Sequence, residues 1–379
     1  MSRPVFPDSK QHFEILDGLR GVAAIMVVMF HLLEIFSGGD HSRQMINHGY
    51  LAVDFFFLLS GFVIGHAYDD RWNKMTTGQF FRRRLIRLHP LIIIGMTIGA
   101  ICFYFSDSAE LFPHVAGTPV WKLLLLLVIG YFLIPVPLSL DIRGWEEMYP
   151  LNGPAWSLFY EYVANILYAF IFRRAATRLL AVLVFLAGSA LAYYSITSPG
   201  GDVIGGWSLT AAQMKIGFLR LLYPFLAGLL LSRLFRPAGF KSSFLLCSIL
   251  VIVFLSIPRV GGISNHWLNG VYDAGTIILI FPLIVFLGAN GTVKEGLASK
   301  ICSFLGDISY PLYIIHFPLM YVFYARVVNN KVPLHEAWPL AALALAVSVT
   351  LAWICFRFYD VPVRKWLTKK YLHSGRPRG

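Results

Sequence analysis

The first apolar stretch of the sequence, residues 19–36, carries ionisable side chains at helical spacing. His31 follows Arg20 by eleven residues, which in an α-helix is a rotation of about 20° beyond three full turns and a rise of about 16 Å. The two side chains therefore share a face, and Asp17 falls on the same side. An ionisable side chain deep in an apolar span is costly, so His31 is a candidate functional residue. The alternative is structural: Asp17 and Arg20 pair at the helix mouth, and His31 hydrogen-bonds a neighbouring carbonyl.

Two other ionisable residues lie deep in apolar stretches. Glu161 is about 18 Å, by helical rise, from the basic end of its segment, and His316 is about 15 Å from the start of its own. We therefore expect His31, Glu161 and His316 to occupy one layer. The structural alternatives are a helix-joining hydrogen bond for Glu161 and, for His316, satisfaction of carbonyls freed by Pro311 and Pro318.

The segment FFRRRLIRLHP places Arg83, Arg84 and Arg87 at the start of a further apolar stretch. Such a run is commonly a topology signal or an anchor for lipid phosphates. Because Arg binds phosphate in a bidentate manner and Arg20 is expected at the same level, the run also predicts a pocket for an anionic, phosphorylated molecule. Ser60 is a possible nucleophile, but the sequence indicates no base beside it.

The composition indicates a membrane protein. Of 379 residues, 57% are hydrophobic and only 14% are charged, which nearly excludes a soluble enzyme. The formal net charge of +12 is spread over short segments between apolar stretches, so it does not indicate nucleic-acid binding. The four Cys are isolated, with no metal-ligand spacing, and the sequence predicts no metal site. The predicted fold class is an all-α polytopic membrane protein.

Charge counting decides how many apolar stretches cross the membrane. A membrane helix needs about 20 residues, and eleven candidates are present. If 120–138 crossed fully, the basic residues after it would move outside, against the positive-inside bias. We therefore expect about ten spans, with both termini cytoplasmic, in the cytoplasmic (inner) membrane. The candidates lie near 19–36, 50–68, 88–105, 120–138, 155–172, 179–195, 216–232, 243–257, 271–288, 306–325 and 339–358.

The segment 119–154 is then a re-entrant or non-spanning element. Pro135, Pro137, Pro150 and Pro154 break it, and irregular backbone persists at membrane depth only where protein or water covers it. We expect it to wall a cavity. No repeat or linker is evident, so 1–379 is expected to be one membrane domain without an appended soluble domain.

Five stretches share a recognisable order and spacing, and together they resemble the acyltransferase-3 family of membrane O-acyltransferases over residues 14 to about 366. The sequence departs from the family pattern at Asp360, where Glu is common, and at His89, where an apolar residue is common. The matching stretches are the R-x10-H pair Arg20 and His31; VDFFFLLSGF with Ser60; RRLIRLHP with Arg83, Arg84 and Arg87; PAWSLFYE with Trp156, Ser157 and Glu161; and GDISYPLYIIH with Ser309, Tyr310 and His316.

The resemblance implies transfer of an acyl group, most commonly acetyl, from cytoplasmic acyl-CoA to a hydroxyl of a carbohydrate or lipid-linked glycan. Arg20 and the arginine run would hold the CoA phosphates. His31 would be general base or transient acyl carrier, and Glu161 or His316 would orient it or relay its proton. The competing hypothesis is a proton-coupled transporter of an anionic metabolite, since broken helices and a midplane His and Glu layer also suit a carrier. The acceptor and the oligomeric state stay open.

Overall fold

The regular secondary structure in the described residues is helical. The predicted cytoplasmic chain ends lie outside the described residues, as do some of the basic residues used to orient the chain. The computed structural model describes residues 13–38, 40, 43–106, 110–112, 114–238, 243–262, 264–293 and 295–372.

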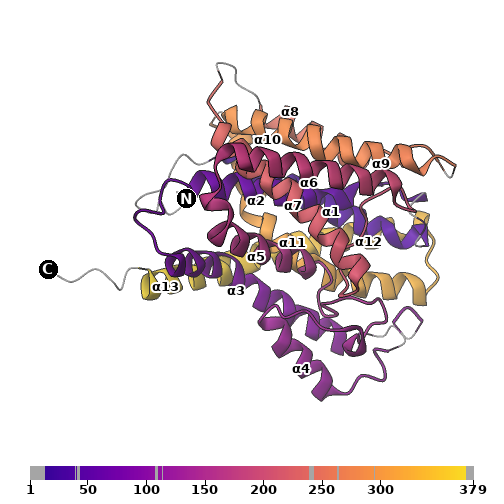
Figure 1. Cartoon of the computed structure of the whole chain (residues 1–379). Helices are drawn as coiled ribbons and strands as arrows, with labels where there is room; N and C mark the ends of the chain where they lie inside the picture. The colour runs from indigo at the N-terminus through magenta and orange to yellow at the C-terminus, as the bar shows by residue number, and fades with distance from the viewer. Residues whose placement is uncertain are drawn as a thin grey trace.

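The helices follow one another with short connections (Figure 1). Two π-helical turns, Thr276–Ile280 and Phe356–Asp360, join α9 to α10 and α12 to α13. The α-helices are α1 Glu14–Glu34, α2 Ala52–Tyr68, α3 Thr77–Tyr104, α4 Val120–Tyr131, α5 Ala155–Phe170, α6 Thr177–Thr197, α7 Ala211–Leu234, α8 Phe244–Ser256, α9 His266–Gly275, α10 Phe281–Asn290, α11 Leu297–Asn329, α12 Leu334–Cys355 and α13 Val361–Tyr371.

Helix α3 begins eleven residues before the span predicted at 88–105. A capping box starts it: the Thr76 hydroxyl accepts from the Gln79 backbone N–H, and the Gln79 side chain accepts from the Thr76 backbone N–H. Hydropathy alone missed this start because the first turns are polar. As a result, the arginine run lies on the helix rather than before it.

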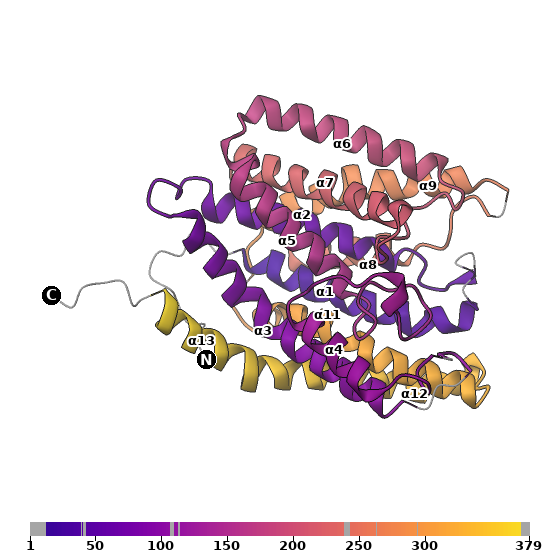
Figure 2. The ribbon, with the colours of Figure 1, turned by 60° about the horizontal axis from the view of Figure 1, so that its bottom comes forward.

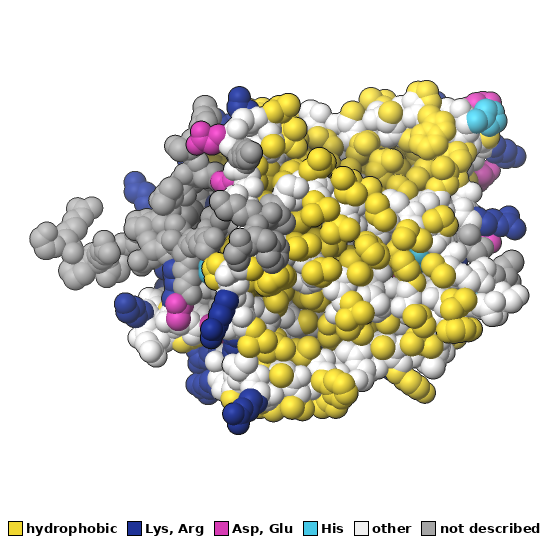
Figure 3. Space-filling view, turned by 90° about the horizontal axis from the view of Figure 1, so that it is seen from above, with side chains coloured by type: hydrophobic (Ala, Val, Ile, Leu, Met, Phe, Trp, Pro, Cys, Tyr) yellow, Lys and Arg dark blue, Asp and Glu magenta, His cyan; other side chains and the backbone are white. Residues whose placement is uncertain are grey.

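The predicted class of all-α polytopic membrane protein is confirmed. Nine helical segments of the described residues are long and apolar enough to cross a membrane. The shorter α8 runs alongside α1. At its start, Phe244 lies against Gly18 near the start of α1. After its end, the Ile257 carbonyl contacts His48, which lies beyond the end of α1. Hydrophobic side chains cover the middle of the face in Figure 3, and Lys, Arg, Asp and Glu gather toward its two ends.

The bundle has two ends, which we name by their contents. The arginine end is where α1 begins and α13 ends, beside the arginine run of α3 (Figures 1 and 2). The far end is where α1 ends and α5 begins. Helix α1 packs along α11, and α2 packs along α7. A Cβ at Gly21 or Gly61 would overlap backbone carbonyls of the partner helix, so these glycines permit the close approach.

The α4 segment, predicted to be re-entrant or non-spanning, returns to the end of the bundle at which it starts. With 12 residues, α4 is about 18 Å long. The hydroxyl of its last residue, Tyr131, lies 2.9 Å from the Thr97 hydroxyl of α3. The chain then turns back: Val136 N donates to Met148 O, and Met148 N donates to Trp207 O in the α6–α7 connection. The segment thus enters and leaves at the far end.

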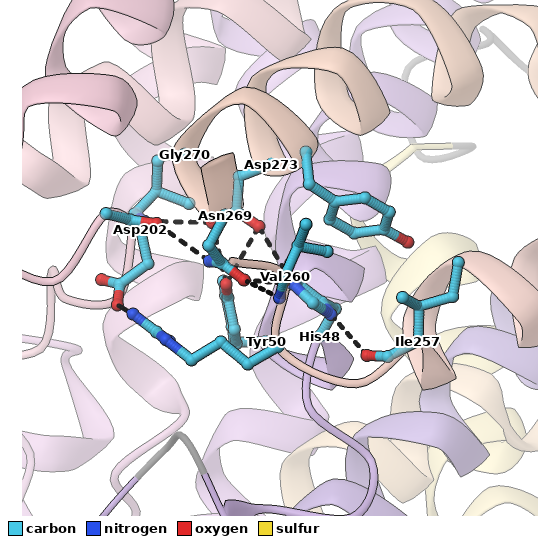
Figure 4. A network of polar contacts seen from close by, with 12 residues as sticks. His48, Tyr50, Asp202, Ile257, Val260, Asn269, Gly270 and Asp273 are labelled. Atoms are coloured by element: carbon cyan, nitrogen blue, oxygen red, sulfur yellow. Dashed lines mark hydrogen bonds and ion pairs between the residues drawn. The ribbon is translucent and has the colours of Figure 1, made fainter. Parts of the chain in front are cut away.

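A buried polar network joins the connections of the far end (Figure 4). One ring nitrogen of His48 lies 2.7 Å from Ile257 O, and the other lies 3.0 Å from Asn269 Oδ1. The Tyr50 hydroxyl donates to Asp273 Oδ2 over 2.8 Å. These residues come from the segment before α2, the segment after α8, and α9, so the network fixes three parts of the chain together.

Candidate active site

The last turn of α1 carries a histidine paired with a carboxylate. His31 Nδ1 lies 2.9 Å from Glu34 Oε2, at the i, i+3 spacing that brings side chains together on a helix. Because a carboxylate oxygen only accepts, Nδ1 carries the hydrogen and the lone pair of the neutral ring lies on Nε2. The Tyr324 hydroxyl of α11 donates to His31 O and lies 3.3 Å from Glu34 Oε2. His31 is thus oriented as a base.

His316 of α11 stacks on this histidine. The ring centroids of His31 and His316 are 5.6 Å apart, with 27° between the planes. His316 Nδ1 donates to the carbonyls of Leu312 and Tyr313, at 3.0 and 2.9 Å, which is the structural role that the sequence left open. Its Nε2 is buried and has no hydrogen-bond partner in the described part of the chain. The two imidazoles therefore offer two Nε2 lone pairs in one place.

Glu161 does not join the histidine layer, contrary to expectation. Its Oε1 accepts from Arg84 Nη2 over 2.7 Å and from the Ser60 hydroxyl over 3.2 Å. The sequence analysis measured the depth of His31 from Arg20. Because Arg20 itself lies six residues, about 9 Å, inside α1, His31 is deeper than expected. Glu161 lies nine residues, about 14 Å, from its helix end, whereas His31 lies seventeen residues, about 26 Å, from the start of α1.

The arginine end holds a cationic cluster. Arg20 pairs with Asp17 over 3.1 Å, and it interacts electrostatically with Arg84, Arg87 and Glu161. Arg84 is buried, while Arg87 and the neighbouring Arg83 are exposed. Arg20 and His31 stand on one helix with about 16 Å of rise between them, so α1 connects the cluster to the histidine pair.

The predicted supporting residues hold α5 and α11 in place. The Ser157 hydroxyl lies 2.7 Å from the Tyr313 hydroxyl and 3.0 Å from Pro154 O. The Tyr310 hydroxyl donates to a backbone carbonyl of α3, and the Ser309 hydroxyl donates to a carbonyl of its own helix. The Trp156 ring packs beside the Arg220 guanidinium of α7. The contacts of Trp156, Ser157 and Tyr310 thus join helices, whereas that of Ser309 stays within α11.

Several residues near the histidine pair escaped sequence reasoning. Glu34 and Tyr324 contact His31 directly, and Arg143, Glu147 and Tyr321 form a buried group near the far end. The three-residue spacing between His31 and Glu34 could have predicted their contact, because side chains at i and i+3 meet on a helix. No pattern could have brought the α4 segment against α11. Among the described residues, no group of three or more His, Cys, Asp or Glu could hold a metal ion.

Comparison with known proteins identifies the family. The family model described as "Acyltransferase domain" matches residues 13–357. Protein 2 in the picA locus of Rhizobium radiobacter is 39% identical over 42% of this chain and 82% of its own length. The O-acetyltransferase OatA of Staphylococcus aureus (strain NCTC 8325 / PS 47) is 22% identical over 98% of this chain. The chain spans 60% of the length of OatA, and no solved structure matches. The chain therefore belongs to the acyltransferase-3 family and is a membrane acyltransferase.

Proposed function

We propose that the protein transfers an acetyl group from acetyl-CoA to a hydroxyl of a carbohydrate or lipid-linked glycan. The observation that carries this proposal is the Glu34–His31 pair stacked on His316, with the Nε2 lone pairs of both rings left for chemistry. A carboxylate that fixes the tautomer of an imidazole is the arrangement of a general base. The name of the relative OatA supports O-acetyl transfer as the reaction.

In the proposed reaction, the acceptor hydroxyl oxygen attacks the thioester carbonyl carbon. The hydroxyl proton passes to Nε2 of His31, and the carboxylate of Glu34 stabilises the imidazolium that forms. The carbon–sulfur bond breaks, and the departing thiolate takes up that proton, so free CoA and an acetyl ester are the products. His316 would relay the proton. In the second route that the geometry supports, one Nε2 first carries the acetyl group.

The cationic cluster is the proposed contact for the CoA phosphates. Arg83 and Arg87 are exposed at the arginine end, and Arg20 is partly buried there beside Asp17. Guanidinium groups bind phosphate oxygens in a bidentate manner. Arg84 is committed to Glu161, so we assign Glu161 to positioning Arg84 rather than to proton transfer. The pantetheine arm would then extend along α1 toward His31.

We also propose that the arginine end faces the cytoplasm and that the protein resides in the inner membrane. The basic residues at that end support this orientation through the positive-inside bias. The test uses single cysteines at two exposed positions, Lys365 at the arginine end and Lys331 at the far end, in a cysteine-free background. A membrane-impermeant maleimide applied to cells should label position 331 and spare 365. The reverse pattern would refute the orientation.

The experiment for the reaction measures O-acetyl content of surface glycans by NMR. Cells make the wild-type protein, no protein, His31→Ala, or the matched control His89→Ala, at equal membrane abundance. His89 is also a membrane histidine, but it contacts Tyr162 instead of the histidine pair. We expect the signal to be lost without the protein and with His31→Ala, and kept with His89→Ala. A signal unchanged in all four strains would exclude surface glycan as the acceptor. A CoA-release assay separates the competing hypothesis, because a transporter would release no CoA.

A further inference from the structure

Arg143 lies in the segment that returns from α4 to the far end, and its side chain is fully buried. Its Nε donates to Pro150 O over 2.6 Å. The guanidinium carbon lies 3.4 Å from the centroid of the Tyr321 ring and 5.0 Å from the rings of Phe103 and Phe112. Both terminal nitrogens are buried without a hydrogen-bond partner in the described part of the chain. Such donors on a charged group are costly to bury, so they indicate a group that this site binds.

Asp141 and Glu147 interact electrostatically with Arg143, but neither accepts a hydrogen bond from its terminal nitrogens. The carboxylate of Asp141 accepts the backbone N–H groups of residues 143, 144 and 146. Glu147 Oε2 accepts from the Tyr321 hydroxyl over 2.5 Å, and burial raises the pKa of Glu147 to about 7. Glu147 is therefore partly protonated at neutral pH. Two adjacent terminal nitrogens whose N–H groups have no acceptor among the described residues match a carboxylate or phosphate, which accepts from both.

The position of Arg143 relates it to the histidine pair. The Tyr321 ring under the guanidinium packs on Phe317 with centroids 4.8 Å apart, and Phe317 packs on His31 at 4.7 Å. Two aromatic rings thus separate the guanidinium from the proposed base. The Trp145 ring lies beside both Tyr321 and Tyr324, so the same aromatic layer also reaches the hydroxyl that contacts Glu34.

The segment that holds Arg143 also borders the outside. An open hollow of about 220 Å³ lies beside it, with His114, Lys122 and Asp141 in its lining. Two residues of this segment have positive φ angles: Gly144, at 89°, and Glu146, at 58°. For Glu146 this is a strained conformation of the kind that concentrates at ligand sites. Asp141 in the lining of this hollow is thus only two residues from the buried Arg143.

We propose that Arg143 binds a carboxylate or phosphate group of the acceptor and so directs the acceptor hydroxyl toward His31. The inference rests on the proposed acyl transfer and narrows its acceptor to an anionic glycan. Arg143 contacts the acceptor away from the reacting atoms, so its removal changes acceptor preference rather than the ability to use acetyl-CoA.

The test measures kcat/KM for purified full-length protein with acetyl-CoA and three acceptors: methyl glucoside, methyl glucuronide and glucose 1-phosphate. The neutral glucoside is the reference, and the other two separate carboxylate from phosphate. We expect wild type to prefer an anionic acceptor by about 10- to 100-fold. Arg143→Gln should remove that preference while acetylation of the glucoside persists, Arg143→Lys should keep part of it, and the exposed-residue control Arg326→Gln should keep all of it.

A second readout separates binding from catalysis. The preferred anionic acceptor should raise the thermal unfolding temperature of His31→Ala, which cannot turn over, and should leave that of Arg143→Gln unchanged. Equal kcat/KM for charged and neutral acceptors in wild type would overturn the assignment of Arg143, as would a preference that survives Arg143→Gln. Absence of CoA release with every acceptor would instead refute the proposed function, and this inference with it.

Discussion

Replacing Glu147 by Gln should change how stability depends on pH. Burial raises the pKa of this carboxyl from 4.5 to about 7, so between these values the folded protein holds a proton that the unfolded chain has released. Stability therefore falls as the pH rises through this window, and the loss is complete above about pH 7. Moving the pKa from 4.5 to about 7 corresponds to about 3 kcal/mol. Gln stays neutral and can still accept from Tyr321, so Glu147→Gln should escape the loss.

The assay measures the free energy of unfolding in detergent at several pH values from 4.5 to 8.5. We expect wild type and Glu147→Gln to agree near pH 4.5, and the variant to be more stable at pH 8 by up to about 3 kcal/mol. Glu146→Gln is the matched control, because Glu146 is the exposed neighbour and should follow wild type. Parallel profiles for wild type and Glu147→Gln across the range would refute the reasoning.

Three further outcomes test other contacts. Asp54→Ala leaves the buried Arg220 charge unpaired and should cost about 3–5 kcal/mol of unfolding free energy, whereas Asp54→Ala combined with Arg220→Met should recover most of it. A double-mutant cycle on Arg84 and Glu161 should give a coupling of about 1–3 kcal/mol; additive losses would contradict the pairing. Glu34→Gln should lower kcat about 100-fold with bilayer insertion unchanged, and a wild-type kcat would exclude its orienting role.

The sequence predicted most of the architecture because the bilayer imposes length and charge rules on every span. That the α4 segment does not cross was predicted by charge counting, since a full crossing would have reversed the basic ends of all later helices. The start of α3 at Thr77 was missed because hydropathy does not register a capping box that precedes polar turns. The 13-residue α8 is shorter than the usual span, and only its contacts with the segments around α1 show its course.

The site was predicted in part, and the errors have one physical origin. Spacing along one helix is reliable, so the relation of Arg20 to His31 needed only helical geometry. Depth compared between helices requires a common reference, and this is where Glu161 was misplaced: it pairs with Arg84 instead. Arg143 and Glu147 lie in an irregular segment whose path is set by tertiary contacts, so no periodic pattern could place them beside α11.

The central claim is that His31 moves the proton during acetyl transfer, and one measurement tests it directly. Purified protein in vesicles receives acetyl-CoA labelled in the acetyl group together with an extract of surface glycans, and free CoA and labelled ester are quantified over time. Wild type should release CoA and form ester in equal amounts. His31→Ala should do neither, while it still binds CoA through the unaltered arginine end. Release and ester formation at the wild-type rate by His31→Ala would contradict the account.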